Sequence, residues 1–321
     1  MIARRIAPLM LVLALASVAR AVEPAAPGLG YDHPLTGRVW DVAQDRFVTL
    51  DALGTAVSGA RFVLLGERHD HPEHHQFQAW LLRRMVDAGR RPAVAFEMLD
   101  TTQAPALARH LAAAPRDAAG LGEAVGWRAA GWPAWRLYQP IADTALAAGL
   151  PIVAANLPAT AARAVTRGDL AALDPALVRR HGLDRPAAEQ AAMEEEIRAA
   201  HCGALPDTLV PGMVTAQRAR DAEMTERLVA GQRDGAVLIA GAGHVRTDRG
   251  VPRVLALLVP EARVVSVGFV EVAEGWTRPA DYAARFGSGP HLPFDYIWFT
   301  ARADNVDQCA RLRRRAPADP D

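Results

Sequence analysis

Six short apolar runs, separated by helical patterns, most strongly limit the folds open to this chain. The runs are rich in Val, Ile, Leu, Phe and Ala and cover residues 62–65, 93–96, 152–155, 236–240, 264–269 and 296–299. Helical periodicity fills several of the intervals, at 72–88, 104–113, 140–148 and 251–258. Strands that alternate with helices predict an α/β fold, in which helices cover both faces of a mainly parallel sheet.

The stretch 159–232 interrupts this alternation. It has no strand pattern and is rich in Ala, Leu, Glu and Arg. We expect a helical insertion that lies over the carboxyl edge of the strands. With 321 residues, of which 50% are hydrophobic, the chain can bury one large core, so we predict a single domain over 22–310, followed by a disordered tail at 311–321.

The first 21 residues have the pattern of a secretory signal. Arg4 and Arg5 precede a short apolar core, which ends in Ala19-Arg20-Ala21. The alternative, an N-terminal membrane anchor, is disfavoured because the core is short for a bilayer. We therefore expect a cleaved signal peptide and a periplasmic or secreted protein that is not an integral membrane protein. In an oxidising compartment the two cysteines would either pair or remain free thiols, and spacing alone does not decide between these states.

Charge and composition exclude some functions. The formal net charge at pH 7 is zero, which gives no basic footprint for nucleic acid. The sequence contains no lysine, so all 36 basic residues are arginine. Schiff-base chemistry and a phosphate-loop lysine are therefore excluded.

Polar residues follow four of the predicted strands directly. Parallel strands bring their carboxyl ends to one edge of a sheet, where ligands bind in open α/β folds. We therefore expect these side chains to share a cleft beneath the 159–232 segment. Two of the histidines end Gly-x-x-His motifs, in which glycine permits a tight exit from the strand. Asp70 and His71 precede Pro72 and are predicted to cap the helix that begins there. The strand-end residues are Glu67, His69, Glu97, Asn156 and His244.

Two other stretches bear on the site. In the helical pattern at 213–228, Gln217 lies on the same face as Arg220 or Asp221 and as several apolar residues. We therefore expect buried polar side chains from this helix to lie over the cleft. The alternative is an intrahelical salt bridge. Trp135 and Tyr138 share a face just before a helix start, for which ordinary core packing is the alternative.

The motifs LLGERHDHPEHHQFQ, AFEM, WRLYQPI, AANLP, QRARDAEM and AGAGHVRTDRGVP occur in this order. Together they resemble the ChaN-like haem-binding family of iron-regulated bacterial lipoproteins, over roughly residues 38 to 300. That family belongs to a superfamily with erythromycin esterases, TraB-like proteins and Tiki metalloproteases. Paired Gly-x-x-His motifs and a glutamate are shared by the superfamily and match His69, His244 and Glu97. No cysteine follows the signal core, so the lipid anchor usual in the family is not expected here.

The resemblance implies a haem-binding protein of extracytoplasmic iron uptake or handling. Tyr138 is then the predicted ligand of the haem iron, Trp135 flanks the macrocycle, and Arg220 and Arg246 meet the propionates. Haem or another small molecule is the expected ligand, and a homodimer and a haem-uptake receptor are the further partners to consider. The competing iron ligands are Tyr31, Tyr282, Tyr296, His71, His74 and His75.

Two alternatives remain for the strand-end cluster. In the first, Glu67, His69, Glu97 and His244 are catalytic in a hydrolase acting on a peptide or ester, with a divalent metal ion held by His69, His244 and Glu97 or with water activated directly. In the second, they form an inherited buried network that only holds the sheet edge together. Whether the chain is an enzyme is left open.

Overall fold

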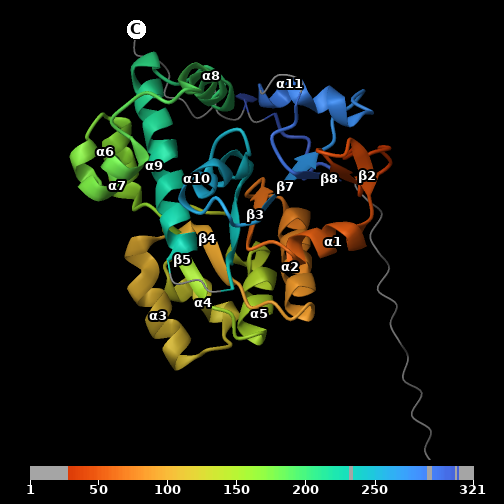
Figure 1. Cartoon of the computed structure of the whole chain (residues 1–321), viewed down its shortest axis with the longest axis horizontal. Coiled ribbons are helices and arrows are strands. Elements are labelled where there is room, and N and C mark those ends of the chain that lie inside the picture. The colour runs from red at the N-terminus through yellow and green to blue at the C-terminus, as the bar shows by residue number, and fades with distance from the viewer. Residues whose placement is uncertain (1–27, 231–233, 288–290, 308, 311–321) are drawn as a thin grey trace, which may run out of the picture.

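The computed structural model describes residues 28–230, 234–287, 291–307 and 309–310 (Figure 1). The predicted signal segment 1–21 and the predicted tail 311–321 lie outside the described residues. One eight-stranded sheet has the order β2-β1-β8-β7-β3-β6-β4-β5. Its strands are β1 Val39–Asp41, β2 Arg46–Val48, β3 Phe62–Glu67, β4 Ala93–Asp100, β5 Ile152–Asn156, β6 Ala236–Gly241, β7 Val264–Glu271 and β8 Tyr296–Thr300.

The predicted fold class is confirmed. All six predicted strands are present, and β8, β7, β3, β6, β4 and β5 run parallel to one another. The sequence did not predict β1 and β2, which form a short antiparallel pair joined to β8. These two strands have three residues each, too few to show an alternating pattern.

The four predicted helices appear within one residue of their expected ends, as α2, α3, α5 and α10. None of the helices in the described part of the chain is long and apolar enough to span a membrane. The helices are α1 Leu50–Ser58, α2 Pro72–Asp87, α3 Ala104–Ala113, α4 Ala118–Ala124, α5 Gln139–Ala147, α6 Ala159–Thr166, α7 Pro175–His181, α8 Gln190–Ala200, α9 Val210–Val229, α10 Val251–Leu258 and α11 Ala283–Phe286.

Each face of the sheet has its own apolar core, because successive side chains of a strand point to opposite faces. Val63 and Leu65 of β3 pack with α1, α2, α4 and α5 in one core. Phe62 and Leu64 of the same strand pack with α9, α10 and α11 in the other. Both faces of β3 are therefore buried, which explains why its sequence is a continuous apolar run.

Between β5 and β6 the described residues form only helices and short 3₁₀ turns. Figure 1 shows α6, α7 and α8 gathered around the long helix α9, which packs on the sheet beside β4, β5 and β6. This segment adds a third, smaller core, which includes Leu157, Val165 and Leu177. Helix α9 thus connects the helical segment with the carboxyl edge of the sheet.

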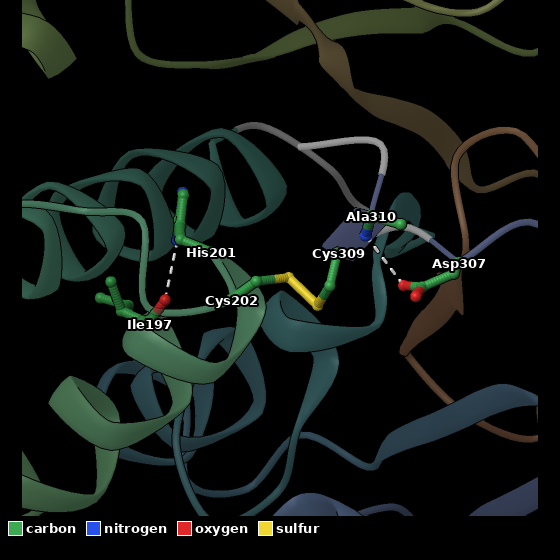
Figure 2. The surroundings of a disulfide bond; sticks show 6 residues. All are labelled: Ile197, His201, Cys202, Asp307, Cys309 and Ala310. Atoms are coloured by element: carbon green, nitrogen blue, oxygen red, sulfur yellow. Dashed lines mark hydrogen bonds between the residues drawn. A yellow bond between two sulfur atoms is a disulfide. The ribbon is translucent and has the colours of Figure 1, made fainter. Parts of the chain in front are cut away.

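A disulfide joins the helical segment to the end of the described chain (Figure 2). Cys202 follows α8 and Cys309 follows β8, and their Cα atoms are 5.4 Å apart, a usual separation for a disulfide. The sequence left open whether the two cysteines pair or remain free thiols, and in the structure they pair.

The connection from β3 to α2 positions the first group of site residues. His71 caps α2 by accepting the backbone N–H of Glu73, and Pro72 occupies the first turn. The predicted capping role of Asp70 is wrong: its carboxylate accepts the Arg68 guanidinium at 2.7 Å. Arginine in the turn offers a charged partner that competes with the helix N-terminus for this carboxylate.

Candidate functional site

Glu67 is the centre of a buried hydrogen-bond network at the end of β3. One carboxylate oxygen, Oε1, accepts the Tyr138 hydroxyl at 2.6 Å and His69 Nδ1–H at 2.9 Å. The other oxygen lies 3.1 Å from His75 Nδ1. Burial opposes ionisation of Glu67, but the charge of His75 and the histidine hydrogen bonds outweigh it and lower the pKa of Glu67 to about 2. Glu67 is therefore a carboxylate at neutral pH.

Both ring nitrogens of His75, on α2, face acceptors, an arrangement that favours the charged ring. Nε2–H donates to the His69 carbonyl oxygen at 3.0 Å. Nδ1 faces Glu67 Oε2 and, at 3.2 Å, Gln78 Oε1. The Gln78 amide is oriented by its N–H bond to the Leu65 carbonyl. Burial disfavours the charged ring, yet Glu67 outweighs it and raises the pKa of His75.

His244 lies between two buried carboxylates. Its Nδ1 is 2.6 Å from Asp221 Oδ1 of α9, and its Nε2 is 3.3 Å from Glu97 Oε1 at β4. Gln217 of α9 also contacts the ring, at 3.1 Å from Nδ1. Burial disfavours the charged ring, but Glu97 and Asp221 outweigh it and raise the pKa of His244 to about 10. His244 is therefore an imidazolium at neutral pH.

His69 is the more exposed histidine of the cluster, with 32% of its side chain accessible. Because Nδ1–H donates to Glu67, Nε2 carries the lone pair in the neutral ring, and it lies 3.9 Å from Glu97 Oε2. Burial lowers the pKa of His69, but Glu97 and Glu67 outweigh this and raise it. A reachable imidazole beside a charged imidazolium can accept and return protons.

Gly241 shapes the space beside His69. A Cβ at this position would lie 3.0 Å from His69 Nε2 and 3.6 Å from Glu97 Oε2. The Gly241 backbone N–H donates to Glu97 Oε2 at 2.7 Å, which fixes that carboxylate against the edge of the sheet. The second Gly-x-x-His motif thus supplies both an anchor for Glu97 and room for His69.

The structure brings together four of the five predicted strand-end residues, Glu67, His69, Glu97 and His244. The fifth, Asn156, donates through its amide to the backbone carbonyl of Glu97. On α9 the contact with His244 is made by Asp221 and not by Arg220, which resolves the alternative in the sequence pattern. In the part of the chain that the structure describes, no group of three or more His, Cys, Asp or Glu is arranged to hold a metal ion.

Tyr138 is completely buried, with 0% exposure. Its hydroxyl donates to Glu67, and its ring packs against His75 and Trp127 at centroid distances of 4.1 and 4.8 Å. Burial and the negative charge of Glu67 raise the pKa of Tyr138. In this structure the side chain is therefore a neutral phenol that donates to a carboxylate.

Arg220 and Arg246, the two arginines predicted to bind the haem propionates, lie in surroundings different from that of Tyr138. Arg246 is 1% exposed and donates to Asp248 at 2.6 Å and to the Phe286 carbonyl at 2.8 Å. Arg220 is half-buried on α9, next to Asp221. The guanidinium of Arg246 is thus engaged inside the protein.

The competing iron ligands differ in accessibility. His71 and His74 are buried, and each accepts a backbone N–H through Nδ1, so each has its remaining proton on Nε2. Tyr282 is buried, with its hydroxyl oxygen accepting the Ala273 N–H. Tyr31 is exposed and donates to Glu73 at 3.1 Å.

Sequence reasoning did not assign His75 and Trp127 to the site. In the sequence, His75 was considered only as a competing iron ligand. Its position, four residues after His71, places it on the same side of the helix as His71, which faces the end of the strand. Trp127 lies outside every helix and strand and had no periodic signal.

A family model described as "Haem-binding uptake, Tiki superfamily, ChaN" matches residues 53–255. Among solved structures, the chain resembles that of "Cofacial heme binding to ChaN of Campylobacter jejuni", with 17% identity and a TM-score of 0.58, over 81% of this chain and 95% of that one.

The type III effector HopBA1 and the erythromycin esterase EreC are less similar. HopBA1 shows 14% identity over 78% of this chain and 93% of its own, and EreC shows 17% identity over 71% and 76%; both have TM-scores of 0.43. No curated protein sequence matches the chain.

Proposed function

Because the chain belongs to the haem-binding uptake family of the Tiki superfamily that includes ChaN, we propose that it binds haem and handles it outside the cytoplasm. The family match, over residues 53–255, is the observation that carries this proposal. The Cys202–Cys309 disulfide supports an oxidising location, since such bonds persist mainly in secreted and periplasmic proteins. Sequencing the N-terminus of the exported protein tests the signal cleavage predicted after Ala21.

Iron ligation by Tyr138 stays a prediction, and the described conformation does not fit it. The hydroxyl would have to leave Glu67 and reach an iron atom from a side chain with no exposed surface. Tyrosinate would also lie beside the Glu67 carboxylate, which disfavours a second negative charge. The propionate contacts of Arg220 and Arg246 likewise stay predictions.

Titration with ferric haem, followed by the Soret band, tests the function and the ligand together. We expect the wild type to bind haem. An unchanged Soret position and affinity in Tyr138→Phe would exclude Tyr138 as the iron ligand, whereas a shifted band would support it. Tyr31→Phe is the matched control, because Tyr31 is exposed and also donates to a glutamate.

The homodimer and the haem-uptake receptor are also proposals. The similar ChaN of Campylobacter jejuni is described as binding haem cofacially, which motivates a test of self-association in this chain. Light scattering of the purified protein, with and without haem, measures its mass and distinguishes a monomer from a dimer.

A His/Glu hydrolase is the second candidate function, and the positions of the two histidines on either side of Glu97 support it. His69 offers an accessible ring nitrogen, and His244, on the far side of Glu97, holds a proton. Such a pair supplies a base and an acid within one site. Hydrolysis of p-nitrophenyl acetate that is abolished in His69→Ala would support this activity, and equal rates with and without wild-type protein would leave it without support.

A further inference from the structure

A cavity of ≈ 330 Å³ lies where the connection between α7 and α8 meets α9 and α10. Helices α9 and α10 lie side by side at this place (Figure 1). The volume is at the lower end of the range for small-molecule sites. Among the described residues of the polar cluster, only Asp221 lines this cavity, so it is separate from the cleft at His69.

Four arginines line the cavity, and Arg218 of α9 differs from the other three. No carboxylate in the described part of the chain forms an ion pair with its guanidinium, which donates to the backbone carbonyls of Arg185 at 2.6 Å and Gly182 at 2.9 Å. A guanidinium has five N–H groups and two are used here, so three remain for a ligand. Burial lowers the pKa of Arg218, the direction expected of a cation whose surroundings do not fully replace water. Each of the other three arginines is in an ion pair: Arg180–Glu226, Arg249–Glu196 and Arg253–Glu189.

Apolar side chains form much of the rest of the lining. Leu183 and Met193 are buried there, with 3% and 6% exposure. Leu257 of α10 is 78% exposed although it also lines the cavity, so it lies at the mouth. A leucine in this position loses contact with water when an apolar group enters, and this burial favours binding.

Asp221 connects the cavity with the polar cluster. Its Oδ1 atom bonds to His244 at 2.6 Å, and the same residue lines the cavity. The negative charge of Asp221 disfavours a ligand with more than one anionic group, because Arg218 alone offers a positive charge without an ion-pair partner. A ligand that enters the cavity should also alter the surroundings of His244.

We propose that this cavity binds a small monocarboxylate with an apolar body, such as an aromatic or short-chain acid. Its carboxylate pairs with the planar Arg218 guanidinium, which can hold both oxygens. Its apolar body packs on Met193 and Leu257. Because the site belongs to the helical segment and α10, it depends neither on haem binding nor on hydrolysis. Occupancy is coupled to the polar cluster through the hydrogen bond between Asp221 and His244.

Phenylacetate is a suitable test ligand, since it carries one carboxylate on a phenyl ring. We expect the full-length wild type to bind it saturably, with a Kd of about 1 mM or lower for a ligand of about ten non-hydrogen atoms. Calorimetric titration gives the Kd, and histidine-selective NMR should show a shift of the His244 signals that saturates with the same Kd. Phenylacetamide, which has the same shape and no charge, should bind about tenfold more weakly.

Arg218→Gln should weaken phenylacetate binding about tenfold, because it removes the charge that meets the carboxylate. Arg227→Gln is the matched control, since Arg227 lies on the same helix, pairs with Glu223 and does not line the cavity; it should change the Kd less than about twofold. Leu257→Ala tests the apolar contact at an exposed position and should weaken binding about threefold. Circular dichroism checks that each variant is folded.

Wild type that binds no phenylacetate, or that binds phenylacetamide equally well, refutes the site. Folded Arg218→Gln and Leu257→Ala that bind phenylacetate like the wild type refute it as well. Inorganic phosphate that displaces phenylacetate at equal concentration would show a general anion site instead. Loss of binding in His69→Ala, with Arg218→Gln unchanged, would move the ligand to the polar cluster. None of these results bears on haem binding, which the Soret titration tests separately.

Discussion

Replacing Asp221 by Asn should lower the pKa of His244 and destabilise the protein at neutral pH. The rise in the pKa of His244 from 6.5 to about 10 corresponds to about 5 kcal/mol in favour of the charged ring. Two carboxylates, Glu97 and Asp221, share this stabilisation. Removal of one should cost roughly 2 kcal/mol and bring the pKa of His244 to roughly 8.

The sign of the pH dependence follows from the raised pKa. Because the folded-state pKa of His244 exceeds the unfolded one, its stabilisation is complete below pH 6.5 and is lost as the pH rises toward 10. The deficit of Asp221→Asn relative to wild type should therefore be largest near pH 6 and shrink at higher pH. Urea unfolding at a series of pH values measures it.

Histidine-selective NMR gives the pKa itself. Wild-type His244 should not titrate between about pH 5 and 8, whereas the Asp221→Asn ring should titrate near 8. Asp51→Asn is the matched control, since Asp51 is 85% exposed and pairs with Arg84, and it should change stability by less than about 0.5 kcal/mol. A wild-type His244 that titrates near 6.5, or an Asp221→Asn ring that stays charged above pH 9.5, would refute this account of the site.

Three other predictions concern the same region. Gly241→Ala places a Cβ 3.0 Å from His69 Nε2 and should shift the NMR signals of that ring, whereas Gly243→Ala, whose nearest contact would be 3.7 Å away, should not. The Glu67 carboxylate, with a pKa lowered to about 2, stabilises the fold above pH 4.5, so urea midpoints should fall as the pH drops from 4.5 toward 2; a flat profile there would contradict its pairing. Replacing both cysteines by serine should cost about 2–5 kcal/mol of unfolding free energy, measured against the oxidised wild type, and an equal urea midpoint would show that the bond does not constrain the unfolded chain.

The sheet could be predicted from sequence because its parallel strands are buried on both faces. Phe62 to Leu65 of β3 reads as an uninterrupted apolar run for that reason. The strand-end residues could also be placed together, since parallel strands end at one edge. The order of the strands could not be obtained, because register and crossover depend on packing between distant segments.

The partners contributed by helices were harder to predict. The sequence pattern allowed either Arg220 or Asp221 to face the site. The rotation of α9 about its axis relative to the sheet determines that Asp221 contacts His244. Tyr138 was expected to face a ligand, but Trp127, from a segment with no periodic pattern, covers it. Local sequence gives no information on such a contact between irregular backbone and a helix start.

The disulfide sets the order of events during synthesis of this protein. Its cysteines are 107 residues apart, and β6, β7 and β8 all lie between them. Cys202 is therefore made before Cys309 and stays a thiol, or a mixed disulfide with another molecule, until these three of the eight strands have been made. The disulfide can therefore tie the helical segment to the end of the described chain only after the last strand, β8, has been made.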